Sequence, residues 1–350
     1  MESMMENCKK WEWNWQSASV FRSELMGVAI LWIMLFHSKI FPPIAQHNFI
    51  GNSIVYQLIL DGGSGVDIFL FLSGMGIYFS WEKNHDLLSF YKKRVIRILP
   101  TYISITGIYW LIYIHHNSPD LSVPALLREW VANVSGYTWF TRGTLTFWYI
   151  PAQIIFYIVA PFFLMMFKKG KVVKNTVFMA AIIAVLCGLY LLSGHESYSN
   201  FDIAIGRIPV FLMGCFIGEW VQEKRPMSKM WCLAAIPAAF CCKIIFGWMR
   251  QQNLAFIILG RGRNLFIAFA ACFMVCFFLS EMQSNRINAC LRWFGTHSLE
   301  LYLLHIIYRN LSRLYFMDWI NQSTVSALGV YGGVLALSCV TAWAWRKIIH

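Results

Sequence analysis

Long apolar stretches, separated by short polar segments, follow one another along almost the whole chain. A helix needs about 20 mostly apolar residues to cross a hydrocarbon core of about 30 Å. The pattern therefore predicts an all-α, polytopic membrane protein with about ten transmembrane helices. The expected spans are residues 22–41, 65–81, 98–116, 148–167, 172–193, 201–220, 229–249, 264–281, 295–315 and 326–345. Residues 1–21 are expected to lie at the cytoplasmic membrane surface, and residues 22–350 to form a single transmembrane domain.

The composition agrees with this pattern and argues against other classes of protein. Of the 350 residues, 58% are hydrophobic and 13% are charged, whereas soluble domains carry about 25% charged residues. The net charge of +12 does not indicate nucleic-acid binding, because basic residues collect in cytoplasmic loops and meet anionic lipids there. The ten cysteines lie mostly in apolar stretches, and no Cys/His spacing predicts a metal site.

The distribution of basic residues predicts the orientation. With the N-terminus in the cytoplasm, most of the 29 Lys and Arg residues fall in cytoplasmic segments, as the positive-inside rule requires. The densest basic clusters, at residues 92–94 and 168–171, both lie on that side. An even number of spans then places both termini in the cytoplasm.

The first span carries polar residues at both ends. Arg22 and Glu24 lie at its start and His37 lies near its other end. Arg22 and His37 are about 22 Å apart along a helix and within about 60° of each other around it. Two interpretations remain open. Arg22 reaches the lipid surface while His37 bonds a neighbouring carbonyl, or both residues face a wet, functional interior.

The second span opens with a glycine-rich turn and an acid. Asp67 lies in the first helical turn, where a carboxylate suits the helix dipole. A two-helix hairpin would also bring Asp67 beside His37, so the acid is either a helix-start residue or a partner for the histidine. Ser73 and Gly74 further along this span allow close helix packing.

Two arginines precede the third span. Arg94 and Arg97 are three residues apart, so a helix presents both guanidinium groups on one face. Such a pair can hold phosphates through bidentate hydrogen bonds. The alternative is an ordinary positive-inside cluster.

Further polar side chains mark candidate pockets. Trp148 and Tyr149 suit the membrane interface, with Gln153 one turn further on. Ser298, Tyr302 and His305 form one polar stripe on an apolar helix, which should face protein or water. Two cations on the predicted outer side, Arg207 and Lys243, require either an anionic ligand or pairing with acids such as Asp202 and Glu219.

Together these motifs resemble the acyltransferase-3 family of integral membrane acyltransferases, which is mostly bacterial. The residues that carry the resemblance are Arg22 to His37, Gly65-Val66-Asp67 through Ser73-Gly74, Arg94 and Arg97 before Pro100, Trp148-Tyr149 to Tyr157 and Pro161, and Ser298 to His305. The resemblance implies an enzyme of the plasma membrane, the inner membrane in bacteria. It would transfer an acyl group, usually acetyl, from coenzyme A to a hydroxyl of an extracytoplasmic glycan, lipid-linked sugar or small molecule.

The resemblance also assigns roles to residues. His37 would be the catalytic histidine. Its chemistry suits a general base or a transient acyl carrier, and by the logic of the Ser-His-Asp triad an acid such as Asp67 or Glu24 could orient its ring. Arg22, Arg94 and Arg97 would serve the acyl-CoA donor. The chain departs from the family at Gln153, where many members have glutamate. No bound cofactor and no nucleic-acid partner are expected; acyl-CoA, an acceptor and membrane lipids are. A transporter or flippase of a glycan or lipid intermediate, without acyl transfer, is the alternative function.

Overall fold

Helices dominate the structure. The computed structural model describes residues 14–45, 54–167, 170–193, 202–251, 257–282 and 284–349. These residues contain no β-strand, and their one sheet-like feature is an isolated antiparallel bridge between Asn14 and Pro226. The predicted all-α class is therefore confirmed.

The helices differ in length. The longer ones are α2 (Arg22–His37), α6 (Gly65–Lys83), α7 (Leu87–Asn117), α8 (Val123–Val134), α10 (Tyr149–Met166), α11 (Val172–Ser193), α14 (Ile208–Gln222), α15 (Lys229–Gln251), α16 (Ile257–Met282), α17 (Asn285–Thr296), α18 (Ser298–Tyr315) and α20 (Thr324–Ile349). The short helices between them are α1 (Ser17–Val20), η2 (Ser38–Ile40), α3 (Pro42–Ala45), α5 (Ile54–Leu60), η3 (Asp61–Ser64), α9 (Tyr137–Arg142), α13 (Asp202–Ile205) and α19 (Met317–Ile320).

The expectation of about ten spans is confirmed only in part. In the described part of the chain, seven helical segments are long and apolar enough to cross a membrane: Arg22–Ile40, Leu58–Lys83, Leu87–Asn117, Tyr149–Met166, Ile203–Gln222, Asn264–Met282 and Thr324–Ile348. Helices α11 and α15 contribute shorter apolar segments, Val172–Ile182 and Leu233–Cys242. Helix α18 carries Glu300, Arg309 and Arg313, which lower its hydropathy. The cytoplasmic position of both termini stays a prediction.

The third and sixth spans differ from their expected boundaries for reasons that single residues explain. Helix α7 begins at Leu87 rather than at residue 98, because the Asp86 carboxylate accepts a hydrogen bond from the Ser89 N–H (2.7 Å) and caps the helix. Arg94 and Arg97 therefore lie inside α7 and not before it. The sixth span is broken between α13 and α14 at residues 206–207. Pro209 lies in the first turn of α14, where a residue without an N–H is tolerated.

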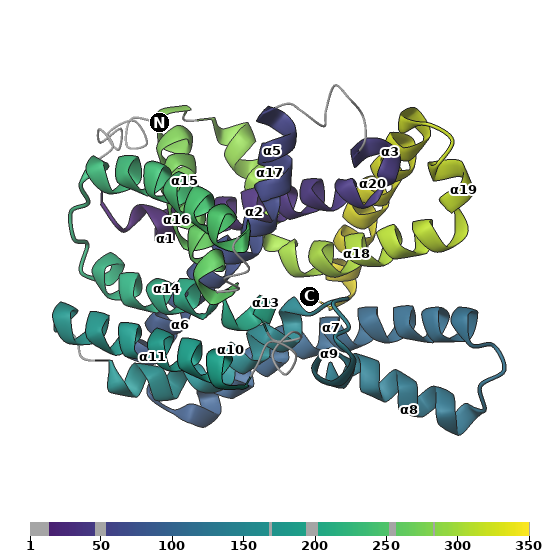
Figure 1. Ribbon diagram of the computed structural model, residues 1–350, viewed down its shortest axis with the longest axis horizontal. Helices are drawn as coiled ribbons and strands as arrows, with labels where there is room; N and C mark the ends of the chain where they lie inside the picture. The colour runs from purple at the N-terminus through teal and green to yellow at the C-terminus, as the bar shows by residue number, and fades with distance from the viewer. Residues whose placement is uncertain are drawn as a thin grey trace.

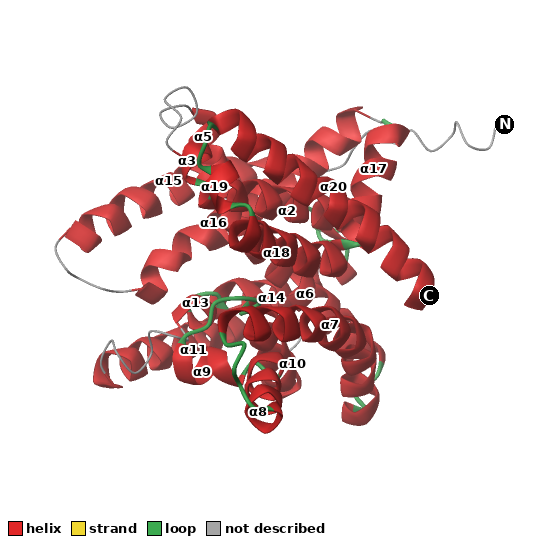
Figure 2. Ribbon diagram, turned by 90° about the vertical axis from the view of Figure 1, so that its right-hand side faces the viewer, coloured by secondary structure: helices red, strands yellow, loops and turns green. Residues whose placement is uncertain are grey.

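Helix α6 lies at the centre of the arrangement. It packs against α2, α10, α14 and α16. Figures 1 and 2 show α2, α17, α18 and α20 grouped on one side of the molecule and α7 to α11 on the other. Figure 1 also shows α7 and α8 as an antiparallel hairpin at one edge. Most of the residues expected to carry the chemistry come from α2, α6, α7, α10 and α18, and side chains from all five helices line one cavity.

Two glycines bring α6 and α14 into backbone contact. A Cβ built on Gly74 would lie 2.2 Å from the Phe211 carbonyl oxygen, and one on Gly214 would lie 2.1 Å from the Phe71 carbonyl oxygen. Any larger side chain at either position would force the helices apart. The close packing expected at Gly74 is thus confirmed.

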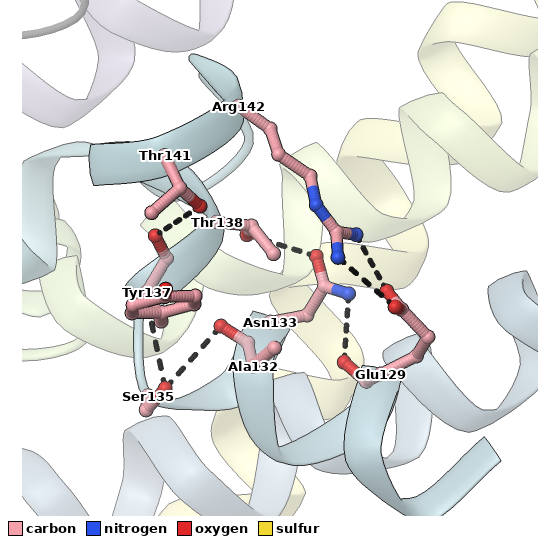
Figure 3. A network of polar contacts seen from close by, with 8 residues as sticks. All are labelled: Glu129, Ala132, Asn133, Ser135, Tyr137, Thr138, Thr141 and Arg142. Carbon is pink, nitrogen blue, oxygen red and sulfur yellow. Dashed lines mark hydrogen bonds and ion pairs between the residues drawn. The ribbon is translucent and has the colours of Figure 1, made fainter. Parts of the chain in front are cut away.

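A polar network joins α8 to α9 (Figure 3). Arg142 donates two hydrogen bonds to the Glu129 carboxylate (2.6 and 3.0 Å), and these bonds lower the pKa of Glu129. Thr138 donates to Asn133 (3.0 Å), whose amide donates to the Glu129 carbonyl (2.8 Å). The network fixes α9 just ahead of residues 143–148, which lead into α10 and the cavities described below.

Candidate active site

Two histidines from distant parts of the chain meet in the interior. His37 ends α2, and His305 lies on α18 with no exposed surface. The Nδ1 atom of His37 is 2.8 Å from the Nε2 atom of His305, and the rings are stacked with centroids 5.0 Å apart. His37 lines a cavity of about 370 Å³, called here the His37 cavity.

The hydrogen bonds fix the tautomers of both neutral rings. His305 Nδ1 lies 2.7 Å from the Leu301 carbonyl oxygen, which can only accept, so Nδ1 carries the proton. His305 Nε2 is then an acceptor, and His37 must donate to it through its own Nδ1–H. The Nε2 atom of His37 consequently holds a free lone pair. A base with its lone pair set in this way can accept a proton from a group in the cavity.

The expectation that an acid orients His37 is wrong. Glu24 lies at the other end of α2 and forms an ion pair with Arg292 (3.1 Å). Asp67 does start α6 beside α2, since a Cβ on Gly65 would lie 2.6 Å from the Ala29 carbonyl oxygen. Its carboxylate, however, pairs with Arg207. The group that orients His37 is His305, a neutral ring.

Asp67 and Arg207 form a buried ion pair. Arg207 Nε is 3.1 Å from Asp67 Oδ1, and both side chains are almost fully buried. Arg207 also donates to the Ile203 carbonyl (2.8 Å) and lies over the Trp148 ring at 5.1 Å. Both Arg207 and Trp148 line the His37 cavity. The pair thus shapes the wall of that cavity.

Glu219 and Asp202 are the acids suggested as partners for Arg207 and Lys243. Glu219 has other partners, and the side chain of Asp202 is not among the described residues. Glu219 accepts a hydrogen bond from the Gly170 N–H (2.5 Å) and lies 3.9 Å from Arg225. Lys243 lies on α15, which packs against α16. The side chains of Lys243 and Asp202 lie outside the described residues. The suggested pairing of Arg207 with Glu219 is therefore wrong.

Cations gather at the opposite end of α2 from His37. Arg22, Lys93, Arg94 and Arg97 line a cavity of about 200 Å³, called here the Arg94 cavity. Arg94 donates to the Phe90 carbonyl (2.7 Å) and lies 3.5 Å from the centre of the Phe90 ring. The Arg22 guanidinium lies against Gly76, where a Cβ would come within 2.4 Å of it. The structure therefore brings together the three arginines that the sequence had singled out.

A small cavity of about 80 Å³, the Gln153 cavity, lies next to the Arg94 cavity. Arg22, Ser73, Arg97 and Tyr157 line both. The Gln153 amide donates to Ser73 Oγ (3.1 Å), which is also 3.1 Å from the Tyr157 hydroxyl. The Gln153 Oε1 atom is buried and has no hydrogen-bond partner. Gln153 can donate to Ser73 in a way that an ionised glutamate could not.

The cavities form a series along α2. Tyr149, Ser298 and Tyr302 line the Gln153 cavity, and Tyr302 lines the His37 cavity as well. Tyr302 packs edge-on against both Tyr149 and His305, with ring centroids 5.3 and 5.9 Å apart. Shared wall residues thus connect the arginine cluster to the histidine pair. The polar stripe expected on α18 faces this interior, as predicted.

Sequence reasoning missed one buried cation. Arg309 lines the His37 cavity and is only 8% exposed. It lies four residues after His305 and so continues the stripe of Ser298, Tyr302 and His305 by one helical turn. Extending the stripe along α18 would have found it.

In the described part of the chain, no group of three or more His, Cys, Asp or Glu side chains could hold a metal ion. Two nitrogens at His37 and His305 bond each other instead. The polar side chains that line the cavities include the His37 imidazole at one end of α2 and three arginines and a lysine at the other.

Comparison with known proteins identifies the family of the chain. A curated relative from Caenorhabditis elegans, "Regulator of hypoxia-inducible factor 1", is 26% identical over 274 residues, which are 68% of this chain and 52% of the worm protein. The chain thus spans about half the length of that relative. No solved structure matches the present chain significantly. The family model described as an acyltransferase domain matches residues 25–343, nearly the whole chain, and the chain belongs to this acyltransferase-3 family.

Proposed function

We propose that the protein transfers an acyl group, acetyl by analogy with its family, from coenzyme A to a hydroxyl of an acceptor, with His37 as the base. The observation that carries the proposal is the tautomer of the His37–His305 pair, which leaves the Nε2 lone pair of His37 free at a cavity. A hydroxyl is a weak nucleophile until a positioned base removes its proton.

In the direct route the acyl group moves from sulfur to oxygen, and His37 carries the proton between them. The acceptor oxygen attacks the thioester carbonyl carbon while His37 Nε2 takes the hydroxyl proton. The C–S bond then breaks, and the thiolate of coenzyme A recovers the proton from His37. The products are an ester and a thiol, and the base is regenerated. In the alternative route, Nε2 attacks the thioester first and passes the acyl group on.

The arginine cluster supports the assignment of the donor. Coenzyme A carries phosphates, which cations bind strongly, and Arg22, Arg94 and Arg97 line adjoining cavities. Arg22 and His37 are about 22 Å apart along α2, so the thioester must reach the base through the interior. We propose that the pantetheine arm passes the Gln153 cavity beside Tyr302. The donor then enters from the cytoplasm, and the acceptor, a glycan, lipid-linked sugar or small molecule, from the other side of the plasma membrane.

One assay separates this function from transport. Purified protein in lipid nanodiscs is incubated with radiolabelled acetyl-CoA and an acceptor extract, and acid-stable label in the acceptor is counted. A transporter or flippase would give no label. Equal labelling by the wild type and by His37→Ala would show that His37 does not take part in the reaction. Rapid quenching and mass spectrometry of the His37 peptide distinguish the two routes, because only the second forms an acylated histidine.

The Arg94 and Arg97 side chains should affect the donor more than the acceptor. A charge-assisted hydrogen bond contributes about 1.5–3 kcal/mol, so Arg94→Ala or Arg97→Ala is expected to raise the KM for acetyl-CoA by about 10- to 100-fold. Lys92→Ala is the control, because Lys92 is exposed on the same helix and lines neither cavity. A larger rise in the KM for the acceptor would assign the pair to acceptor binding.

His305 should act by positioning His37. His305→Leu removes the acceptor for His37 Nδ1–H, so the ring can turn or change tautomer, and we expect kcat to fall about 10- to 100-fold. His305→Gln offers an oxygen in place of Nε2 and should retain more of the rate. Steady-state kinetics of both variants test this. Equal losses in Leu and Gln variants would mean that His305 only fills space.

A further inference from the structure

A second cavity adjoins the His37 cavity on the side away from the arginine cluster. It has a volume of about 390 Å³ and is called here the Arg313 cavity. Arg309 and Thr146 line both cavities. Tyr109, Tyr113, Asn310 and Arg313 complete most of its wall. A molecule that occupied both cavities would extend from the histidine pair to this wall.

Arg309 is a buried cation without an acidic partner. Its guanidinium donates to the neighbouring Asn310 side-chain oxygen through Nε (3.1 Å) and Nη2 (2.8 Å), and it forms no ion pair with any described acid. Arg207, the other arginine of the His37 cavity, is neutralised by Asp67. A buried charge normally has a counterion, because leaving it unpaired costs free energy. Arg309 therefore lacks a counterion, and an anionic ligand can supply one.

The surroundings of Arg309 suit an anion. Arg313 follows one turn later on α18 and adds a second, exposed cation. Asn310 is held by its own bond to the Tyr109 hydroxyl (3.1 Å) and keeps Arg309 in place. No Asp or Glu lines either cavity among the described residues. Two guanidinium groups without opposing carboxylates are typical of sites for phosphate or carboxylate.

We propose that the acceptor carries an acidic group, a phosphate or a carboxylate, which Arg309 and Arg313 hold while its hydroxyl meets His37. The proposal rests on the proposed function and narrows its acceptor class. Arg309 lies one turn from His305, so an acid bound there places the rest of the acceptor beside the histidine pair. The donor phosphates have a separate cluster at the other end of α2.

A binding experiment tests the anion site without requiring turnover. The full chain in nanodiscs of neutral lipid is saturated with coenzyme A, and inorganic phosphate and acetate are titrated in by calorimetry. We expect phosphate, acetate or both to bind, and Arg309→Gln to weaken that binding by about tenfold or more. Arg313→Gln, at an exposed position, should weaken it in the same direction even if Arg309→Gln misfolds. Arg128→Gln, exposed on α8 and outside the cavities, should have no effect.

A second experiment tests the acceptor itself. The labelled product of the transfer assay is separated on an anion exchanger before and after phosphatase treatment. Label that binds the exchanger supports the proposal, and its release by phosphatase distinguishes phosphate from carboxylate. A neutral product, or anion binding that is the same in the wild type and both arginine variants, would overturn it. Absence of transfer with intact anion binding would contradict the proposed function but not the anion site.

Discussion

Replacement of His37 by alanine is expected to lower the rate of acyl transfer by about 10²- to 10⁴-fold. In the proposed reaction the base is the lone pair on His37 Nε2, which the His37–His305 hydrogen bond leaves free, and alanine offers no such base. Acetyl-CoA should still bind, because the arginine cluster lies at the far end of α2. The measurement is kcat from the radiolabel assay, together with the Kd for coenzyme A.

The control for this variant is His115→Ala, which removes an exposed histidine at the end of α7. It should leave kcat and donor binding unchanged. His37→Gln adds a second test, since glutamine keeps the polarity of the position but cannot accept the proton. A rate for either His37 variant within a few-fold of wild type would mean that another group is the base.

Replacement of Asp67 by asparagine is expected to destabilise the protein by about 3–5 kcal/mol, the usual cost of leaving one member of a buried ion pair alone. Arg207 would keep its charge in a place with almost no solvent contact. The unfolding midpoint, followed by loss of coenzyme A binding on heating, should drop clearly. Loss of activity at lower temperature should be modest, because Asp67 does not contact His37.

The double variant Asp67→Asn with Arg207→Gln separates stability from catalysis. It removes both charges, so its unfolding midpoint should lie above that of Asp67→Asn alone. If Asp67→Asn were as stable as wild type but inactive, Asp67 would take part in the reaction after all. The Asp67–Arg207 pair would then act in the reaction itself, and shaping the wall of the cavity would not be its main role.

Much of the fold could be predicted from hydropathy alone. Apolar stretches long enough to cross a bilayer are read directly from the sequence, so α2, α6, α10 and α20 begin and end near their expected residues. Helix ends and breaks that depend on local polar residues are harder to predict from hydropathy. The cap at Asp86 starts α7 early, and the break at residues 206–207 divides a stretch whose hydropathy is continuous. Both depend on single side chains that an average over about 20 residues does not register.

The sequence singles out many of the side chains that line the cavities, but it does not predict how they pair. Arg22, Arg94 and Arg97, which the family resemblance assigns to the acyl-CoA donor, line one cavity. The partner of His37 could not be inferred, since His305 lies 268 residues further along the chain. A two-helix hairpin predicts that Asp67 lies beside His37, but the α13–α14 break brings Arg207 to Asp67 instead. Contacts between distant helices depend on packing that one sequence does not encode locally.

The contact between Gly74 and Phe211 also limits how this gene can change. Every missense mutation of a glycine codon adds at least a Cβ atom, and here that atom would lie 2.2 Å from a carbonyl oxygen. The next residue back along the chain is Ser73, which accepts the hydrogen bond from Gln153. Inherited variation at residue 74 would therefore move the wall of the Gln153 cavity, so we expect this position to admit little change other than silent substitutions.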